Sequence, residues 1–466
     1  MEYISTRGSA PALDFEGVTL AGLASDGGLY LPREWPRFNQ AEIAAMAGLP
    51  YPELAARIMS PFVAGSLSDE ELLELCRQAY GRFAHAAVTP LVQLDQRQWL
   101  LELFHGPTLA FKDVALQLLG LLFEKFLERR GSNLTIIGAT SGDTGSAAID
   151  AVAGREGVDI FMLHPSGRVS DVQRRQMTTV RAPNVHNIAI EGSFDDAQAM
   201  VKRMFADESM TSRFNIGAVN SINWARLMAQ VVYYFAAGLQ LGAPHRSIAF
   251  SVPTGNFGDV FAGYVAHKMG LPITQLIVAT NVNDILHRAL RGGDYSTGKL
   301  MPTATPSMDI QVSSNFERLL FDCGGRDGAA LAEQMRAFEA TRAMQLTNSQ
   351  REGAAHLFTS ARADAGAMAR ALRWAHERAG QVIDPHTAVG LHAAIESDLD
   401  RSIPIVTLAT AHPAKFADAV ERATGIRPAL PVRVGDIFAR EEVCSQLSGN
   451  YEAVRDFVAA RATPAG

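Results

Sequence analysis

Lys112 is the residue whose type and position point most directly to chemistry. It stands in the segment 104–117, Phe-His-Gly-Pro-Thr-Leu-Ala-Phe-Lys-Asp-Val-Ala-Leu-Gln, after a Gly-Pro turn and before apolar residues at helical spacing. The pattern predicts that Lys112 lies in the first turn of a helix with a buried body. The positive end of the helix dipole and partial burial both favour a neutral amine, which is a nucleophile able to form a Schiff base. A solvated surface lysine is the alternative.

Two glycine-rich turns follow predicted strands and open predicted helices. The first reads Gly-Ala-Thr-Ser-Gly-Asp-Thr-Gly-Ser over 138–146, and the second reads Pro-Thr-Gly-Asn-Phe-Gly-Asp over 253–259. In this arrangement backbone N–H groups point outward and can hold an anion. Neither turn has the P-loop spacing or the dinucleotide fingerprint. Glycine is also common in ordinary turns between strand and helix. The two turns therefore indicate an anion-binding site only when they are considered together with Lys112.

Composition restricts the class of protein. The chain has 466 residues, a net charge of -7, 47% hydrophobic and 20% charged residues, as in a globular protein that does not bind nucleic acid. The three cysteines form neither a disulfide framework nor a metal-binding pattern, so we expect no metal and a reducing cytoplasm. We see no signal peptide and no apolar run of the roughly 18 residues that a membrane helix needs. No feature indicates the oligomeric state, and a monomer or a dimer is expected.

Strands and helices alternate around the two turns, which predicts an α/β fold with parallel sheets flanked by helices. The expected strands cover 99–104, 134–138, 160–163, 185–190, 247–252, 273–279 and 403–409. The expected helices cover 41–47, 51–59, 68–80, 146–152, 172–180, 194–205, 222–239, 257–269, 329–346, 361–379 and 387–397. Residues 292–315 are expected to form a long irregular connection.

The same pattern divides the chain into three parts. Residues 1–90 predict a small, mainly helical N-terminal domain, and residues 91–320 predict the α/β lobes that hold Lys112 and both turns. Residues 321–466 are expected to return to the large domain. Within this part the tail 428–466 is less regular and is expected to wrap back over the body.

The segments 104–117, 138–148 and 252–259 together resemble the threonine synthase family, pyridoxal-phosphate enzymes of the tryptophan synthase β fold group. The length and the separate N-terminal domain resemble the longer branch of that family, found in fungi and many bacteria. The resemblance implies two lobes and pyridoxal 5'-phosphate as cofactor. Further similar segments are Tyr-Ile-Ser-Thr-Arg-Gly at 3–8, Gly-Gly-Leu-Tyr-Leu-Pro at 27–32, Asn-Ser-Ile-Asn-Trp-Ala-Arg at 220–226 and Thr-Ala-His-Pro-Ala-Lys-Phe at 410–416.

The resemblance also implies roles for individual residues. Lys112 would form the Schiff base with the cofactor and later move protons. Thr410 would face the pyridine nitrogen, where a neutral hydroxyl leaves the ring largely unprotonated. The cofactor phosphate would lie on Gly255, Asn256, Phe257, Gly258 and Asp259. The substrate α-carboxylate would lie on Thr140, Ser141, Gly142, Asp143 and Thr144. Asp143 would also face the ring hydroxyl, and a carboxylate there repels a phenolate unless one of the two is protonated.

The implied reaction converts O-phospho-L-homoserine and water to L-threonine and phosphate by β,γ-elimination and water addition. It requires a second phosphate pocket, for which the candidates are Asn223, Arg226, Ser314 and Arg318, with Lys415 and His386 as further candidates. Each of these residues also has an ordinary structural interpretation. Two alternatives remain for the whole chain. The first is a phospho-lyase that stops at elimination and yields 2-oxobutyrate, and the second is a non-catalytic protein that carries pyridoxal phosphate.

Overall fold

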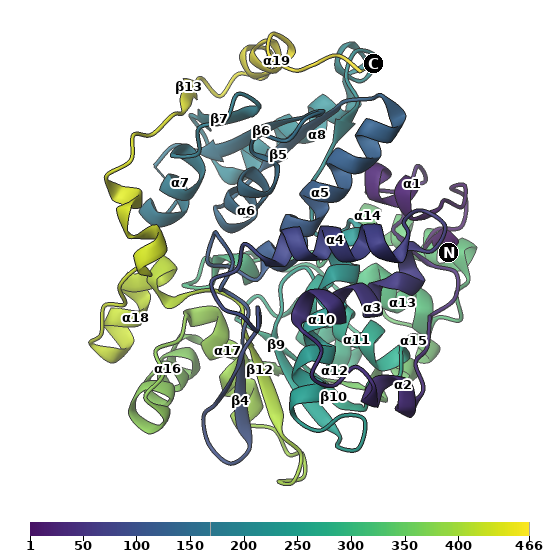
Figure 1. Ribbon diagram of the computed structural model, residues 1–466, viewed down its shortest axis with the longest axis vertical. Coiled ribbons are helices and arrows are strands. Elements are labelled where there is room, and N and C mark those ends of the chain that lie inside the picture. The colour runs from purple at the N-terminus through teal and green to yellow at the C-terminus, as the bar shows by residue number, and fades with distance from the viewer. Residues whose placement is uncertain (168, 466) are drawn as a thin grey trace.

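The larger of two sheets forms the lower lobe of the molecule in Figure 1. The computed structural model describes residues 1–167 and 169–465, and in this part of the chain the larger sheet has six strands. Its pairs are parallel except for the antiparallel edge pair β3–β4. In sheet order the strands are β11 (Phe358–Arg362), β10 (Ile273–Thr280), β9 (Ile248–Pro253), β12 (Ile405–Ala409), β4 (Gln98–Glu102) and β3 (Leu91–Gln93).

The smaller sheet forms the upper lobe and is parallel throughout the described chain. Most of it comes from the stretch between β4 and β9, and its outer strand comes from near the C-terminus. In sheet order the strands are β13 (Ser445–Leu447), β7 (Val185–Ile190), β6 (Val158–Pro165), β5 (Leu134–Ala139) and β8 (Ile216–Gly217).

Two long helices carry the main core. Both faces of α5 (Lys112–Arg130) are buried, and α5 packs against α4 (Asp69–Tyr80), α6 (Asp143–Val152) and α10 (Trp224–Gln240). Of these, α6 is the crossover helix between the parallel strands β5 and β6. None of the helices in the described ranges is both long and apolar enough to span a lipid bilayer. The other helices up to β10 are α7 (Asp171–Thr178), α8 (Phe194–Ala206), α9 (Glu208–Thr211) and α11 (Gly258–Lys268). Those after β10 are α12 (Ile285–Gly292), η1 (Pro306–Met308), α13 (Phe316–Cys323), α14 (Gly328–Thr341), α15 (Asn348–Ala355), α16 (Ala365–Ala379), α17 (Pro385–Ile395), η2 (Pro413–Phe416), α18 (Ala417–Thr424), η3 (Val432–Phe438) and α19 (Tyr451–Ala459).

The N-terminal region packs directly onto this core. It contains the antiparallel pair β1 (Tyr3–Ser5) and β2 (Tyr30–Pro32), with α1 (Phe15–Ala21), α2 (Gln40–Ala44) and α3 (Tyr51–Val63) before α4. Tyr3 contacts Trp224 of α10 with ring centroids 5.8 Å apart, and Arg7 pairs with Glu317 of α13 at 3.2 Å. The region therefore shares a core with the lobes.

The predicted α/β fold, with parallel sheets in two lobes and an N-terminal helical region, is confirmed. Two helix predictions need correction. The helix expected over 361–379 begins at Ala365, because Phe358–Arg362 forms the edge strand β11. The helix expected over 329–346 ends at Thr341, and a second helix, α15, follows.

The C-terminal part of the chain contacts both lobes. We expected residues 321–466 to return to the large domain, and α16, α17 and β12 do so. Figure 1 shows the yellow C-terminal segment leaving α18 and climbing the left edge to the upper lobe. There β13 pairs with β7, and α19 buries Tyr451, Val454 and Val458 against the smaller sheet.

Candidate functional site

Lys112 is the first residue of α5 and is only 9% exposed. The loop before it is joined to the end of β12: the Phe111 N–H donates to the Thr410 carbonyl at 2.8 Å, and Ala110 and Ala411 form an antiparallel bridge. Leu109 in this loop has a φ of 63°, a conformation that costs a residue with a side chain about 1–3 kcal/mol. Burial lowers the pKa of Lys112, as the sequence led us to expect. The solvated-lysine alternative is therefore wrong.

Asp143 opens α6 and faces Lys112. Its Oδ2 lies 3.4 Å from the Lys112 Nζ, and its Oδ1 lies 2.7 Å from the Lys415 Nζ and accepts a 2.8 Å hydrogen bond from Gln173. Burial opposes the ionised form, but Lys415 and Lys112 outweigh it and hold the pKa of Asp143 below its usual value. Gln173 also belongs to this site, although no sequence pattern singled it out.

The first glycine-rich turn leaves the start of α6 open to a ligand. Gly142 has a φ of 138°, which favours glycine, and as the N-cap residue of α6 it has no side chain that could bond the first turn. The Thr140 hydroxyl accepts from the N–H groups of Gly142 and Gly145 at 2.9 Å and holds the turn. Ser141 is exposed and Thr144 is half-buried. The turn therefore has the form of an anion site, and its role toward a carboxylate stays a prediction.

The second turn is built in the same way at the start of α11. Phe257 has a φ of 63° and no side-chain cap is present, so the first N–H groups of α11 remain available. The carbonyl groups of this turn accept hydrogen bonds from the segment before α13. Ser313 donates to the Gly255 carbonyl at 2.7 Å. The main chain and the side chain of Asn315 both donate to the Asn256 carbonyl at 3.0 Å. These bonds turn the N–H side of the loop outward, and the loop fits a phosphate.

Asp259 lies in the first turn of α11 and is 8% exposed. The hydroxyls of Tyr233 and Tyr234 both donate to its Oδ1, while its buried Oδ2 has no partner among the described residues. Burial raises the pKa of Asp259 to about 7. A carboxyl that is partly protonated near neutral pH can lie close to an anion, because its neutral form does not repel the charge.

Arg226 differs from the other candidates for the second phosphate pocket. It is 3% exposed, and Nη1 donates to the Val219 carbonyl at 2.9 Å. Its Nε has no partner and no carboxylate pairs with it in the described chain. Burial lowers the pKa of Arg226 to about 10. The positive charge of Arg226 also lowers the pKa of Lys112, so the two side chains are close enough to interact electrostatically.

The other candidates use their polar groups within the protein. Arg318 is wholly buried and donates to the Asn315 side chain, to the Tyr30 carbonyl at 2.9 Å and to the Ile222 carbonyl at 2.6 Å. Asn223 caps α10 and donates to the Thr19 carbonyl at 2.9 Å. The half-buried Ser314 contacts only Ser221 through its hydroxyl, at 3.4 Å, in the described chain. These contacts position α10 and α13, and phosphate binding by these residues stays a prediction.

His386 and Thr410 lie on neighbouring elements of the larger sheet's lobe. His386 opens α17, where its Nδ1 lies 2.8 Å from Asp384 and its buried Nε2 lacks a partner among the described residues. Thr410 directly follows β12 and is 7% exposed. Its expected role toward a pyridine nitrogen stays a prediction.

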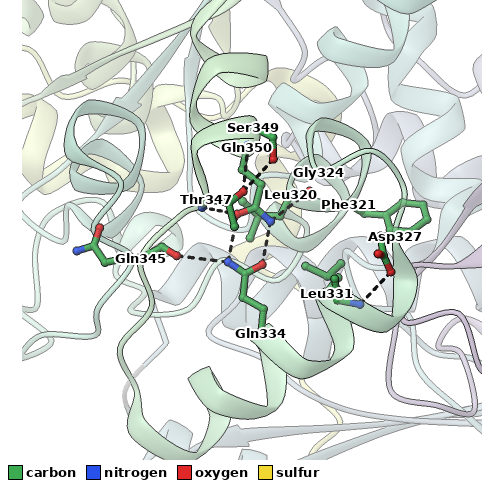
Figure 2. A pocket seen from close by; sticks show the side chains of 11 residues that line it. Leu320, Phe321, Gly324, Asp327, Leu331, Gln334, Gln345, Thr347, Ser349 and Gln350 are labelled. Atoms are coloured by element: carbon green, nitrogen blue, oxygen red, sulfur yellow. Dashed lines mark hydrogen bonds between the residues drawn. The ribbon is translucent and has the colours of Figure 1, made fainter.

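A separate cavity of about 370 Å³ lies where α13, α14 and α15 meet (Figure 2). None of the predicted site residues lines it. Its glutamine side chains bond to one another, since Gln350 donates to Gln334 at 2.8 Å and Gln334 donates to Gln350 at 3.1 Å. The cavity is therefore distinct from the site around Lys112.

Comparisons with known proteins identify the family of the chain. Family models described as Threonine synthase N terminus, Pyridoxal-phosphate dependent enzyme, and Threonine synthase, C-terminal match residues 2–80, 83–367 and 387–458. Threonine synthase from Pseudomonas aeruginosa is 57% identical over 98% of both chains. That from Saccharomyces cerevisiae is 44% identical, with 90% of this chain and 88% of the yeast chain covered. The crystal structure of threonine synthase from Brucella melitensis with pyridoxal phosphate bound has a TM-score of 0.97, 49% identity and 99% of each chain covered. The chain belongs to the threonine synthase family of pyridoxal-phosphate-dependent enzymes.

Proposed function

We propose that the enzyme converts O-phospho-L-homoserine and water into L-threonine and inorganic phosphate. The main support for this proposal is the state of Arg226. Its guanidinium is buried, has no carboxylate partner in the described chain, and interacts electrostatically with Lys112. A buried, unpaired cation is costly, and a bound anion compensates it. Since the α11 turn offers a site for the cofactor phosphate, Arg226 is available for a second phosphate, that of the substrate.

The residues around Lys112 fit pyridoxal phosphate. The uncapped turn at Gly255, Asn256, Phe257 and Gly258 would hold its phosphate, with Asp259 behind the turn, and Thr410 would face its ring nitrogen. When bound, the cofactor withdraws electrons from the substrate and so makes the protons on its α-carbon acidic.

The side chains of this enzyme would then bind the substrate and move protons. The N–H groups of Ser141, Asp143 and Thr144 would hold the α-carboxylate at the start of α6. Those of Thr140 and Gly142 are bound to the Leu163 carbonyl and the Thr140 hydroxyl. Lys112 Nζ, kept partly neutral by burial, would take the proton from the α-carbon and then one from the β-carbon. Arg226 would hold the γ-phosphate until it leaves. Water must reach the β-carbon only after that step, which favours closure of the two lobes over the site.

The test is to incubate the purified enzyme with O-phospho-L-homoserine and to identify the organic product. We expect L-threonine and phosphate in equal amounts. If 2-oxobutyrate were the main product, the enzyme would be the phospho-lyase that the sequence left open. We also infer that the enzyme works in the cytoplasm, since its three cysteines are free thiols.

A further inference from the structure

The carboxylate of Asp143 is shared by two lysines. Lys415, from η2, approaches Oδ1 at 2.7 Å, while Lys112, from α5, lies 3.4 Å from Oδ2. The shorter contact is therefore with Lys415, which the sequence offered only as a further candidate for the phosphate pocket. A carboxylate with one cationic neighbour would stabilise that neighbour's ammonium and so keep it protonated. With two neighbours, this attraction is divided.

Lys415 is held in place on both sides. Its side chain has no exposed surface, and its Nζ also donates to the Thr108 carbonyl at 2.9 Å. The same carbonyl accepts from Gln176 at 2.9 Å. Thr108 is fixed in turn, since its N–H and hydroxyl donate to Asp113 at 2.8 and 2.6 Å. The ammonium of Lys415 is thus bound to the loop that leads to Lys112, and it is buried in place.

Several groups around the Lys112 nitrogen decide whether it is protonated. Burial disfavours its ammonium, Asp143 favours it, and Lys415 and Arg226 disfavour it. The Phe111 ring lies 4.8 Å from the nitrogen. The charged groups that act on Lys112 come from four elements, namely Asp143 on α6, Lys415 on η2, Arg226 on α10 and Asp259 on α11.

We propose that Lys415 is a positioning residue that occupies Asp143 and thereby releases Lys112 to attack the aldehyde of pyridoxal phosphate. In that step the Lys112 ammonium first gives one proton to solvent. The neutral Nζ then forms a C=N bond to the aldehyde carbon, and the aldehyde oxygen leaves as water with the two remaining protons of Nζ. Lys415 stays bound to Asp143 throughout and keeps the carboxylate neutralised after Lys112 has reacted.

This arrangement also removes a conflict in the expected site. An isolated carboxylate beside the cofactor's ring oxygen would repel it. Because Lys415 lies within 2.7 Å of Asp143, the pair has no net charge and the repulsion is relieved. The inference rests on the proposed attachment of the cofactor to Lys112, and is independent of which product the enzyme releases.

The test measures the rate at which apo-enzyme attaches pyridoxal phosphate, followed by visible absorbance from pH 6 to pH 10. Lys415→Met keeps the length of the side chain and removes its charge. We expect the midpoint of the pH–rate profile to rise, with about tenfold slower attachment at neutral pH for each unit of rise. Lys415→Arg should stay close to the wild type. A wild-type midpoint in Lys415→Met would overturn the proposal.

Two further variants separate the mechanism from a general loss of structure. In an Asp143→Asn background, Lys415→Met should shift the midpoint less, because only the direct repulsion between the two ammonium groups is then removed. An equally large shift there would contradict action through Asp143. If Lys415→Met alone does not fold, the double variant, with both charges removed, should attach the cofactor with a midpoint near the wild type, and a midpoint raised in it would reject the proposal. Lys125→Met is the matched control, since Lys125 pairs with Glu71 at 2.8 Å elsewhere on α5.

Discussion

The N–H group of Phe111 donates to the carbonyl of Thr410 at 2.8 Å. This bond joins the residue before Lys112, the proposed nucleophile, to Thr410, the residue expected to face the cofactor's ring nitrogen. The adjoining Ala110–Ala411 bridge makes the junction a short piece of antiparallel sheet. Two groups from distant parts of the chain are thereby held in one backbone frame, as precise catalysis requires.

Lys112→Arg should abolish threonine formation. Arginine keeps the positive charge, but its guanidinium stays protonated and cannot form the covalent bond to the cofactor. The measurement is threonine release, together with the protein mass after borohydride reduction, which should include the cofactor in the wild type only. Retained turnover in this variant would show that another residue is the nucleophile.

Arg226→Gln should weaken binding of the substrate phosphate. Hydrogen bonds to a charged group contribute about 1.5–3 kcal/mol, which corresponds to a rise of roughly 10- to 150-fold in KM for O-phospho-L-homoserine. The matched control is Arg318→Gln, in which the lost hydrogen bonds are internal, so the melting temperature should fall while KM changes little. If KM rose in Arg318→Gln and stayed unchanged in Arg226→Gln, the substrate phosphate would bind at α13 instead.

Gly255→Ala should reduce the affinity of apo-enzyme for pyridoxal phosphate. A Cβ at this position would overlap the Ser307 carbonyl, so the connection around η1 and the turn must separate. Gly292→Ala is the control, because a Cβ there meets open space. Equilibrium titration with the cofactor measures both variants, and equal dissociation constants would show that the turn does not bind the phosphate.

Asp259 should make the stability of the apo-enzyme depend on pH. Burial raises its pKa from 3.8 to about 7, so the folded state binds the proton more tightly than the unfolded state. The stabilisation is complete below pH 4 and is lost as the pH rises toward 7. Relative to Asp259→Asn, the wild type should lose unfolding free energy across this range and then level off. Parallel curves in urea denaturation between pH 4 and pH 8 would contradict the raised pKa.

Sequence patterns predicted the parts of the site that depend on local structure. The helix start at Lys112, both uncapped turns and the strand that ends before Thr410 all have signals within a few residues. Gln173 has none, because its role comes from the way α7 packs beside α6. The same is true of the bond between Lys415 and Asp143, which joins residues that only the fold brings together.

The missed elements have a similar explanation. β11 is an edge strand with the exposed residues Thr359 and Arg362, so it lacks the apolar run of the central strands. β13 has three residues and is fixed by its pairing with β7, not by its own propensity. The tail therefore reads as irregular, although the structure gives it a defined place beside the smaller sheet.

The position of β12 between β9 and β4 has a consequence for synthesis of the enzyme. A growing chain folds from its N-terminal end as it leaves the ribosome. Until residues 405–409 have emerged, β4 and β9 each lack the partner on the side where β12 will lie. The Phe111 N–H also has no Thr410 carbonyl to bind. Lys415 arrives later still. Nascent or truncated chains therefore lack the complete pocket, and capture of the cofactor must wait until nearly the whole polypeptide has been made.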